Sequence, residues 1–122
     1  MKKILLISDT HGYIDDVILK YAKKADLVIH AGDIGDINVI DSLSKVSNLR
    51  AVYGNIDSAE IRSITNENEL LNIEGFKILT THIAGKQPNY NSRVKKIINK
   101  EYPDILIYGH SHILKVENDK KN

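Results

Sequence analysis

The sequence predicts a single α/β domain built on a parallel β-sheet, and three observations lead to this fold class. Short apolar runs alternate with segments of helical periodicity through the first half of the chain, which is typical of parallel strands joined by right-handed crossovers. An apolar run at residues 104–108 lies between turn-forming residues, as expected of a strand buried on both faces. The length of 122 residues suits one domain with one hydrophobic core. We therefore expect residues 1–122 to form one unit.

Strands and helices alternate in the first half of the chain. Strands are predicted at residues 3–8, 26–31 and 49–53. Asp36 is suited to be the N-cap of the second helix. The apolar stripe of the first helix consists of Ile14, Val17, Ile18, Tyr21 and Ala22, and that of the second consists of Ile37, Ile40, Leu43 and Val46.

The alternation ends after the third strand. Residues 60–68 are polar and are predicted to be irregular. Two β-rich runs at residues 70–73 and 76–81 are separated by a turn that contains a glycine, and this pattern predicts a β-hairpin. The second half of the chain therefore departs from a purely parallel arrangement.

A third helix is predicted after a loop at residues 88–92. Ser92 can cap this helix, and Pro103 ends it before the strand at residues 104–108. A last strand is expected at residues 113–117. Basic residues in this region predict a solvated helix face rather than an anion-binding patch, and they are Lys86, Arg93, Lys95, Lys96 and Lys100.

Composition limits the kinds of function that need to be considered. The 17 basic and 16 acidic residues nearly cancel, so no nucleic acid partner is expected. Because the chain has no cysteine, disulfides and thiolate metal ligands are excluded. The apolar run after the basic N-terminus is shorter than the roughly 7–15 residues of a signal peptide, and no run reaches the roughly 20 residues of a membrane span. We therefore expect a soluble cytoplasmic protein with no membrane partner.

Metal-binding side chains follow the predicted strands. Any one of them can be a turn residue alone, because Asp and Asn favour turns. Their coincidence favours a metal site, since parallel strands end at the same edge of a sheet and imidazole is a common metal ligand. The fifth histidine, His30, lies within a strand and is predicted to be a core imidazole or a support for a ligand. The strand-end residues are Asp9, His11, Asp33, Asn55, His82, His110 and His112.

Five motifs in this order resemble the calcineurin-like metallophosphoesterases, in particular their short bacterial and archaeal phosphodiesterase branch. They are Asp9-x-His11, Gly32-Asp33, Gly54-Asn55-x-Asp57, Thr81-His82 and Gly109-His110-x-His112. The resemblance implies a four-layer α/β/β/α sandwich, in which two mixed sheets pack face to face with helices outside. Asp36 and Asp57 are predicted to support the ligands or to serve as a cap and a turn.

The resemblance also implies a dinuclear metal site. Two divalent cations about 3.5–4 Å apart would generate a bridging hydroxide for in-line attack on phosphorus. The mixed nitrogen and oxygen ligands favour Mn, Fe, Zn, Co or Ni over Mg, and Mn is the first guess. The first cation is assigned to Asp9, His11 and His112, the second to Asn55, His82 and His110, and the bridge to Asp33, while Asp33, Asn55 and His82 are the predicted catalytic residues.

The implied activity is that of a phosphodiesterase or phosphomonoesterase acting on a small phosphate ester, and the alternative is a non-catalytic interaction module with the same fold. Ile56 stands where the protein phosphatase branch has a histidine that protonates the leaving group, which favours substrates that need little acid catalysis. Relatives continue for several tens of residues beyond the last motif, whereas this sequence has ten residues after His112. We therefore expect an incomplete second sheet with an exposed edge, and a chain that is either a homo-oligomer or less stable than its relatives.

Overall fold

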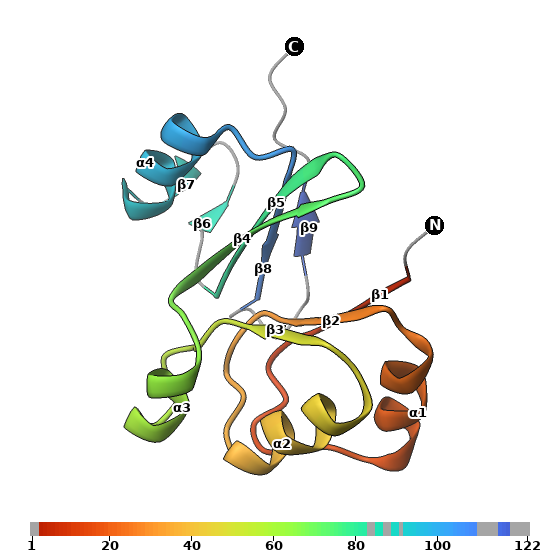
Figure 1. The fold of residues 1–122 in the computed structure, drawn as a ribbon. Helices are drawn as coiled ribbons and strands as arrows, with labels where there is room; N and C mark the ends of the chain where they lie inside the picture. The colour runs from red at the N-terminus through yellow and green to blue at the C-terminus, as the bar shows by residue number, and fades with distance from the viewer. Residues whose placement is uncertain (1–2, 83–84, 87–88, 91, 110–114, 118–122) are drawn as a thin grey trace.

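Two β-sheets pack face to face, and helices cover their outer sides (Figure 1). The computed structural model describes residues 3–82, 85–86, 89–90, 92–109 and 115–117. The first sheet has the order β1-β2-β3 and is entirely parallel. Its strands and their connecting helices are β1 (Ile4–Ile7), α1 (Asp16–Lys24), β2 (Leu27–His30), α2 (Ile37–Val46) and β3 (Leu49–Ala51).

The second sheet is mixed and has the order β4-β5-β8-β9. The β4–β5 and β8–β9 pairs are antiparallel, and the β5–β8 pair is parallel. Helix α3 leads from the first sheet to the second, and α4 precedes β8. The remaining elements are α3 (Ala59–Ile64), β4 (Asn68–Ile73), β5 (Phe76–Thr81), the short pair β6 (Gly85–Lys86) and β7 (Asn89–Tyr90), α4 (Ser92–Glu101), β8 (Ile105–Tyr108) and β9 (Lys115–Glu117).

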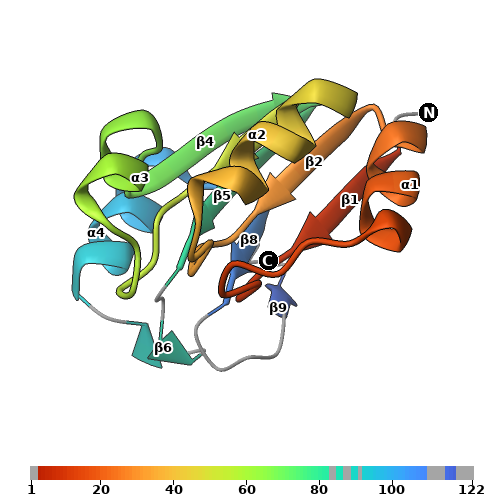
Figure 2. The ribbon, with the colours of Figure 1, turned by 90° about the horizontal axis from the view of Figure 1, so that it is seen from below.

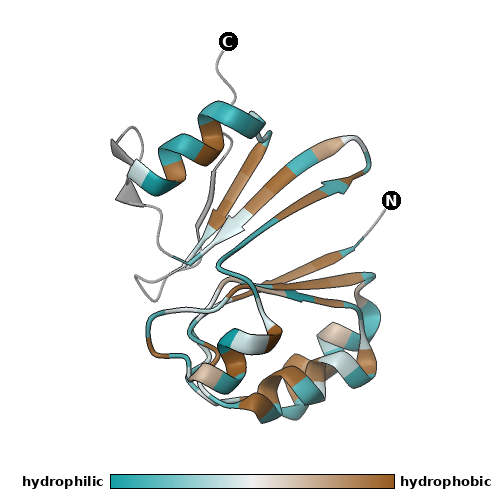
Figure 3. Cartoon of the chain, turned by 60° about the vertical axis from the view of Figure 1, so that its left-hand side comes forward, coloured by the Kyte–Doolittle hydropathy of each residue, from teal (hydrophilic) through white to brown (hydrophobic). Residues whose placement is uncertain are grey.

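Three apolar layers separate these four layers of secondary structure. Because successive strand residues point to opposite faces, neighbours in β2 contribute to different cores: Val28 packs among the helices and Ile29 packs between the sheets. Figure 3 shows this apolar character along the strands and on the inner sides of the helices. The core beneath α1, α2 and α3 includes Val28, Leu43 and Ile61, the core between the sheets includes Ile29, Ile78 and Ile107, and the core beneath α4 includes Leu79, Val94 and Leu106. The four-layer α/β/β/α sandwich is therefore confirmed.

The prediction that residues 60–68 are irregular was wrong. Helix α3 occupies Ala59–Ile64, and the Ser58 side chain accepts a hydrogen bond from the Ile61 backbone N–H at 3.4 Å. Ile61 is the buried residue that fixes this helix against the first core. One apolar anchor in six residues gives too little periodicity to reveal a helix, so tertiary packing decides the structure here. Strand β4 also begins at Asn68, two residues earlier than expected.

The cap of α2 was predicted correctly, whereas the apolar face of α1 and the loop at residues 88–92 were not. Asp36 caps α2 as predicted, because its carboxylate accepts a hydrogen bond from the Asn38 N–H at 2.9 Å. In α1, by contrast, Val17 and Tyr21 are about 60% exposed and do not belong to the core stripe. The helix lies against the sheet through a narrower face that includes Ala22. Strand β7 lies within the predicted loop at residues 88–92, and of the predicted strand at residues 113–117 only β9 falls among the described residues.

Helices of membrane-spanning length and hydropathy do not occur in the part of the chain that the structure describes.

Candidate metal centre

The loops that follow β1 and β2 run side by side and are joined by backbone hydrogen bonds. The Asp9 N–H donates to the Gly32 carbonyl at 2.9 Å, and the His11 N–H donates to the Asp33 carbonyl at 3.0 Å. Asp9, His11 and Asp33 all have positive φ angles, of 55°, 50° and 55°. Residues with a Cβ rarely adopt this conformation, and it concentrates at functional sites. The parallel pairing of the two strands thus holds two acidic loops in one fixed geometry.

Three buried ligand atoms converge at this edge of the first sheet. One atom each from Asp9, Asp33 and His82 lies within 4.8 Å of the others. The Nε2 atom of His82 is 3.2 Å from Asp33 Oδ2 and 3.8 Å from Asp9 Oδ1, and all three side chains are 4% exposed. His11 approaches from the solvent side, with its Nε2 atom 3.7 Å from Asp33 Oδ2. His82 comes from the end of β5, so the centre joins the two sheets.

The backbone orients the ring of His82. Its Nδ1 atom is 2.7 Å from the carbonyl oxygen of Ala31, and since a carbonyl can only accept, Nδ1 carries the hydrogen. This tautomer directs the Nε2 lone pair toward the two carboxylates, which is the usual arrangement of a metal-binding histidine. Gly32 allows the close approach, because a Cβ at that position would lie 2.5 Å from the ring nitrogen.

The chemistry of these residues fits a divalent cation. Asp9 Oδ2 accepts a hydrogen bond from Ser8 Oγ at 2.6 Å, whereas Asp9 Oδ1 is buried and has no hydrogen-bond partner among the described residues. A buried carboxylate oxygen without a partner costs free energy, and a second buried carboxylate beside it adds repulsion. A bound cation would remove both costs. Carboxylate oxygens and an imidazole nitrogen together suit Mn, Fe, Co, Ni or Zn.

The remaining predicted ligands lie around this cluster or outside the described residues. Asn55 lines the same pocket as His82, and the next N–H along the chain, that of Ile56, donates to Asp33 Oδ1 at 3.2 Å. Gly109 donates its N–H to the His82 carbonyl at 3.1 Å, and a Cβ on Gly109 would lie 2.9 Å from Asp9 Oδ2. The chain therefore reaches the cluster at the first residue of its last motif. His110 and His112 themselves lie outside the described residues.

Asp57 joins the loop after β2 to the loop after β3. Its Oδ2 atom accepts hydrogen bonds from the N–H groups of Ile34 at 3.1 Å and Gly54 at 2.8 Å. Its Oδ1 atom accepts from the N–H of Gly35 at 2.8 Å. Asp57 is 5% exposed and is directed at backbone donors rather than at the cluster. It thus positions the segments that carry Asp33 and Asn55.

His30 is buried beneath these loops, in agreement with its prediction as a core or supporting imidazole. Its Nδ1 atom accepts from the Gly32 N–H at 3.1 Å, so the hydrogen is on Nε2, which donates to Thr10 Oγ1 at 2.9 Å. The Thr10 hydroxyl in turn donates to the Ile34 carbonyl at 3.0 Å. Sequence reasoning missed Thr10, although its position between two predicted ligands was a usable signal.

Burial lowers the pKa of His30 from 6.5 to about 4, although the charges of Asp57 and Asp9 oppose the shift. The unfolded chain therefore takes up a proton below about pH 6.5 that the folded chain does not, so stability is lost as the pH falls. We expect the free energy of unfolding to decrease by about 2 kcal/mol between roughly pH 7.5 and pH 5 from this residue alone. Urea denaturation in EDTA of the native chain and of His30→Gln measures this, and equal pH slopes would contradict it.

Sequence reasoning also missed the pocket next to His82. The pocket has a volume of about 320 Å³, and its walls include Tyr53, Arg62 and Glu67.

Arg93, predicted to lie on a solvated helix face, is instead half-buried. It donates to Asn68 Oδ1 at 2.6 Å and to Thr81 Oγ1 at 3.2 Å, and it forms an ion pair with Glu67 at 3.0 Å. That part of the prediction was wrong for Arg93. Lys95, Lys96 and Lys100 are exposed as expected.

Comparison with protein families and curated proteins identifies similar sequences. A family model described as the calcineurin-like phosphoesterase superfamily domain matches residues 1–122. A protein of Methanocaldococcus jannaschii named "probable metallophosphoesterase" is 32% identical over 113 residues. This alignment covers 88% of the chain and 57% of that protein, so the chain spans little more than half of its relative.

Similar folds occur among solved structures. The structure described as a novel archaeal phosphodiesterase has a TM-score of 0.63 and 27% identity, covering 91% of this chain and 74% of that one. Vps29 of Entamoeba histolytica, solved in complex with Zn²⁺, has a TM-score of 0.70 and 26% identity, covering 92% of this chain and 66% of that one.

Proposed function

Because the chain belongs to the calcineurin-like phosphoesterase superfamily, we propose that it is a divalent-metal-dependent hydrolase of small phosphate esters, either diesters or monoesters. One observation carries this proposal most directly. Asp9, Asp33 and His82 direct three ligand atoms to one buried point, and one of them, Asp9 Oδ1, has no hydrogen-bond partner among the described residues. Such a cluster is costly without a cation and favourable with one.

We assign two cations to the centre, with Mn²⁺ as the first choice. When bound, divalent cations would lower the pKa of a water molecule and neutralise charge that develops on the phosphoryl oxygens. Zn²⁺ is a further candidate, since the similar Vps29 structure contains it. The proposed ligands are Asp9, His11 and His112 for one cation and Asn55, His82 and His110 for the other, with Asp33 shared between them.

Other residues of the chain contribute position rather than chemistry. The Ala31 carbonyl fixes the tautomer of His82, and the Ile56 N–H fixes one oxygen of Asp33. Asp57 holds the backbone of the two loops in register. Ile56 is about half exposed and cannot donate a proton to a leaving oxygen. The proposed substrates are therefore esters whose leaving group departs without a strong acid.

The second candidate function is that of a non-catalytic interaction module. It is favoured by one observation, the similarity of the fold to Vps29, because related folds can serve different functions. A module of this kind does not require a complete set of metal ligands. Metal-binding residue types at the five described positions favour the enzyme, but the similar Vps29 structure also contains Zn²⁺, so metal-dependent turnover is the observation that separates the two functions.

Hydrolysis of bis-p-nitrophenyl phosphate in the presence of Mn²⁺ tests the proposal. We expect turnover that is abolished by EDTA and restored by added Mn²⁺, since the hydrolytic chemistry depends on the cation. Elemental analysis of the reconstituted protein is expected to give two metal ions per chain. Absence of turnover with Mn²⁺, Fe²⁺, Zn²⁺, Co²⁺ and Ni²⁺, in protein that binds the metal, would instead support the interaction module.

A further inference from the structure

The pocket beside the metal centre connects the predicted ligands to two helices on the same side of the molecule. His82 and Asn55 form one wall of this pocket. Arg62 on α3 and Arg93 on α4 line it from helices that pack against different sheets (Figures 1 and 2). Its volume of about 320 Å³ is at the lower end of the range for small-molecule sites. A small substituent of a phosphate ester would fit in this space.

Arg62 brings to this pocket a positive charge that no carboxylate of the described residues balances. Its Nε atom donates to the Asp57 carbonyl at 2.9 Å, and its Nη2 atom is 3.4 Å from the carbonyls of Gly54 and Asn55. Carbonyl oxygens are neutral acceptors, so these bonds orient the guanidinium without neutralising it. No carboxylate oxygen of the described residues lies within ion-pair distance of Arg62.

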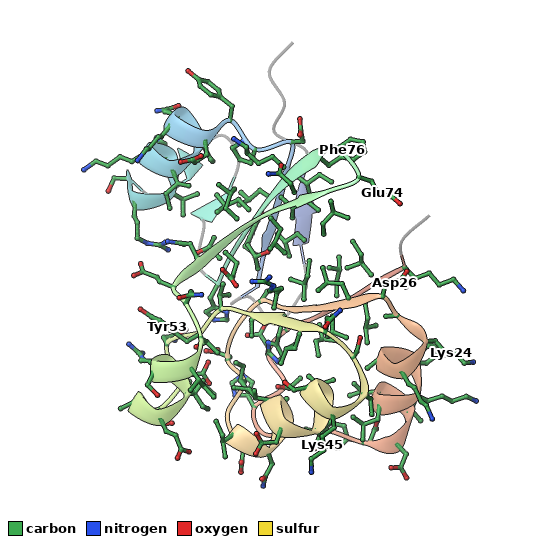
Figure 4. All side chains as sticks on the ribbon, viewed as in Figure 1. Lys24, Asp26, Lys45, Tyr53, Glu74 and Phe76 are labelled. Carbon is green, nitrogen blue, oxygen red and sulfur yellow. The ribbon has the colours of Figure 1, made fainter. Side chains whose placement is uncertain are left out.

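An aromatic ring further restricts the guanidinium. The Arg62 guanidinium carbon lies 4.7 Å from the centre of the Tyr53 ring, a cation–π distance. Figure 4 labels Tyr53 next to the start of α3. Because stacking and carbonyl bonds both hold the group, little side-chain entropy remains to be lost when it binds a ligand. Arg62 is therefore preorganised as well as charged.

The second arginine of the pocket is neutralised. Arg93 Nε lies 3.0 Å from Glu67 Oε1, and its other nitrogens bind Asn68 and Thr81. The Tyr53 hydroxyl also lies 3.5 Å from Glu67. Among the described residues of the pocket wall, Arg62, Arg93 and Glu67 are ionised, and together they leave one net positive charge, that of Arg62.

We propose that this pocket recognises a second anionic group of the substrate, so that the preferred esters carry a carboxylate or a further phosphate a few bonds from the reacting phosphorus. The inference rests on the proposed function, because it assigns the reacting phosphoryl group to the metal centre and leaves Arg62 for the substituent. A guanidinium binds both carboxylate and phosphate through paired hydrogen bonds, so the shared feature is the negative charge.

Calorimetric titration of the Mn²⁺-loaded protein tests this specificity without requiring turnover. The probes are 2-carboxyethyl phosphate and propyl phosphate, which are similar in size and differ by one negative charge. We expect the carboxylate to bind about fivefold more tightly, a preference that falls at high salt because Arg62 is accessible to solvent. Equal affinities of the native protein for the two probes would overturn the proposal.

Two variants should move this preference in opposite directions. Arg62→Gln is expected to remove it, and Glu67→Gln is expected to increase it about threefold by releasing the charge of Arg93. Arg50→Gln, a change of the same charge on β3 outside the pocket, should leave the ratio unchanged. The native Arg62 side chain also supports residues 54–57. If Arg62→Gln therefore does not fold, Glu67→Gln decides the question. An unchanged ratio in Glu67→Gln and in every folded Arg62 variant would refute the assignment.

The carboxylate preference and the catalytic proposal can fail separately. A charge preference that responds to the variants in a protein without hydrolytic activity would remove the proposed function and keep the pocket as an anion site. Metal-dependent hydrolysis combined with equal binding of both probes would keep the proposed function and remove this inference.

Discussion

Replacing Asp33 by Asn is expected to lower kcat/KM for bis-p-nitrophenyl phosphate about 10³-fold, the largest effect of any single substitution proposed for this chain. Asp33 Oδ2 is the oxygen closest to His82 Nε2 and also faces His11. Asparagine has nearly the same shape, but it lacks the negative charge that the two proposed cations would need between them. Initial rates over a range of Mn²⁺ concentrations, combined with elemental analysis, measure both activity and metal content.

Asp36→Asn is the matched control for this substitution. Asp36 lies three residues further along the same loop, but its carboxylate caps α2 by accepting the Asn38 N–H. Because asparagine is an equally good N-cap, we expect activity and stability to change little. Comparable losses in both variants would show that the loop is sensitive to any substitution, and Asp33 would then have no special role in the centre.

The sequence was sufficient to predict the convergence at the sheet edge because topology produces it. Asp9 and Asp33 follow strands that pair in parallel, so the ends of β1 and β2 meet at one edge whatever the exact register. His82 was harder to place, because it reaches the cluster from the other sheet. It was predicted from its place at the end of the second hairpin strand, and the order of the motifs in the resemblance supported that prediction.

The pocket could not be predicted because its residues have no pattern in the sequence. Arg62 lies on a helix of six residues that only Ile61 anchors in the first core. Arg93 is one of several basic residues on α4 and resembles its exposed neighbours until its contacts with Thr81 and Asn68 are seen. Periodicity reports which side of an element is buried, but it does not report which partner a polar side chain meets across a layer boundary.

The contacts of Asp57 could not be predicted for the same reason. The sequence was equally consistent with Asp57 as a turn residue and as a residue that supports the metal ligands. Its carboxylate accepts three backbone N–H groups from two separate loops. Replacing it by Ala is expected to lower the free energy of unfolding by about 4 kcal/mol, because three backbone donors, two of them in buried hydrogen bonds, lose the charged acceptor that they share. Asp57→Asn retains one acceptor oxygen and is expected to cost about half as much. Urea denaturation in EDTA measures both values.

Measuring stability without metal separates the roles of the two buried aspartates. In EDTA, Asp57→Ala should be strongly destabilising, whereas Asp33→Asn should be neutral or stabilising because it removes one of two repelling carboxylates. The exposed helix residue Asp41 provides the baseline, and Asp41→Ala is expected to change stability by no more than about 0.5 kcal/mol. If Asp33→Asn proved as destabilising as Asp57→Ala in EDTA, the cluster would be a structural network of the folded chain. The opposite signs follow from what each carboxylate faces. Both oxygens of Asp57 accept backbone N–H groups, whereas only Oδ1 of Asp33 does so, and Asp33 Oδ2 faces His82 Nε2 and the Asp9 carboxylate, which a bound cation would satisfy.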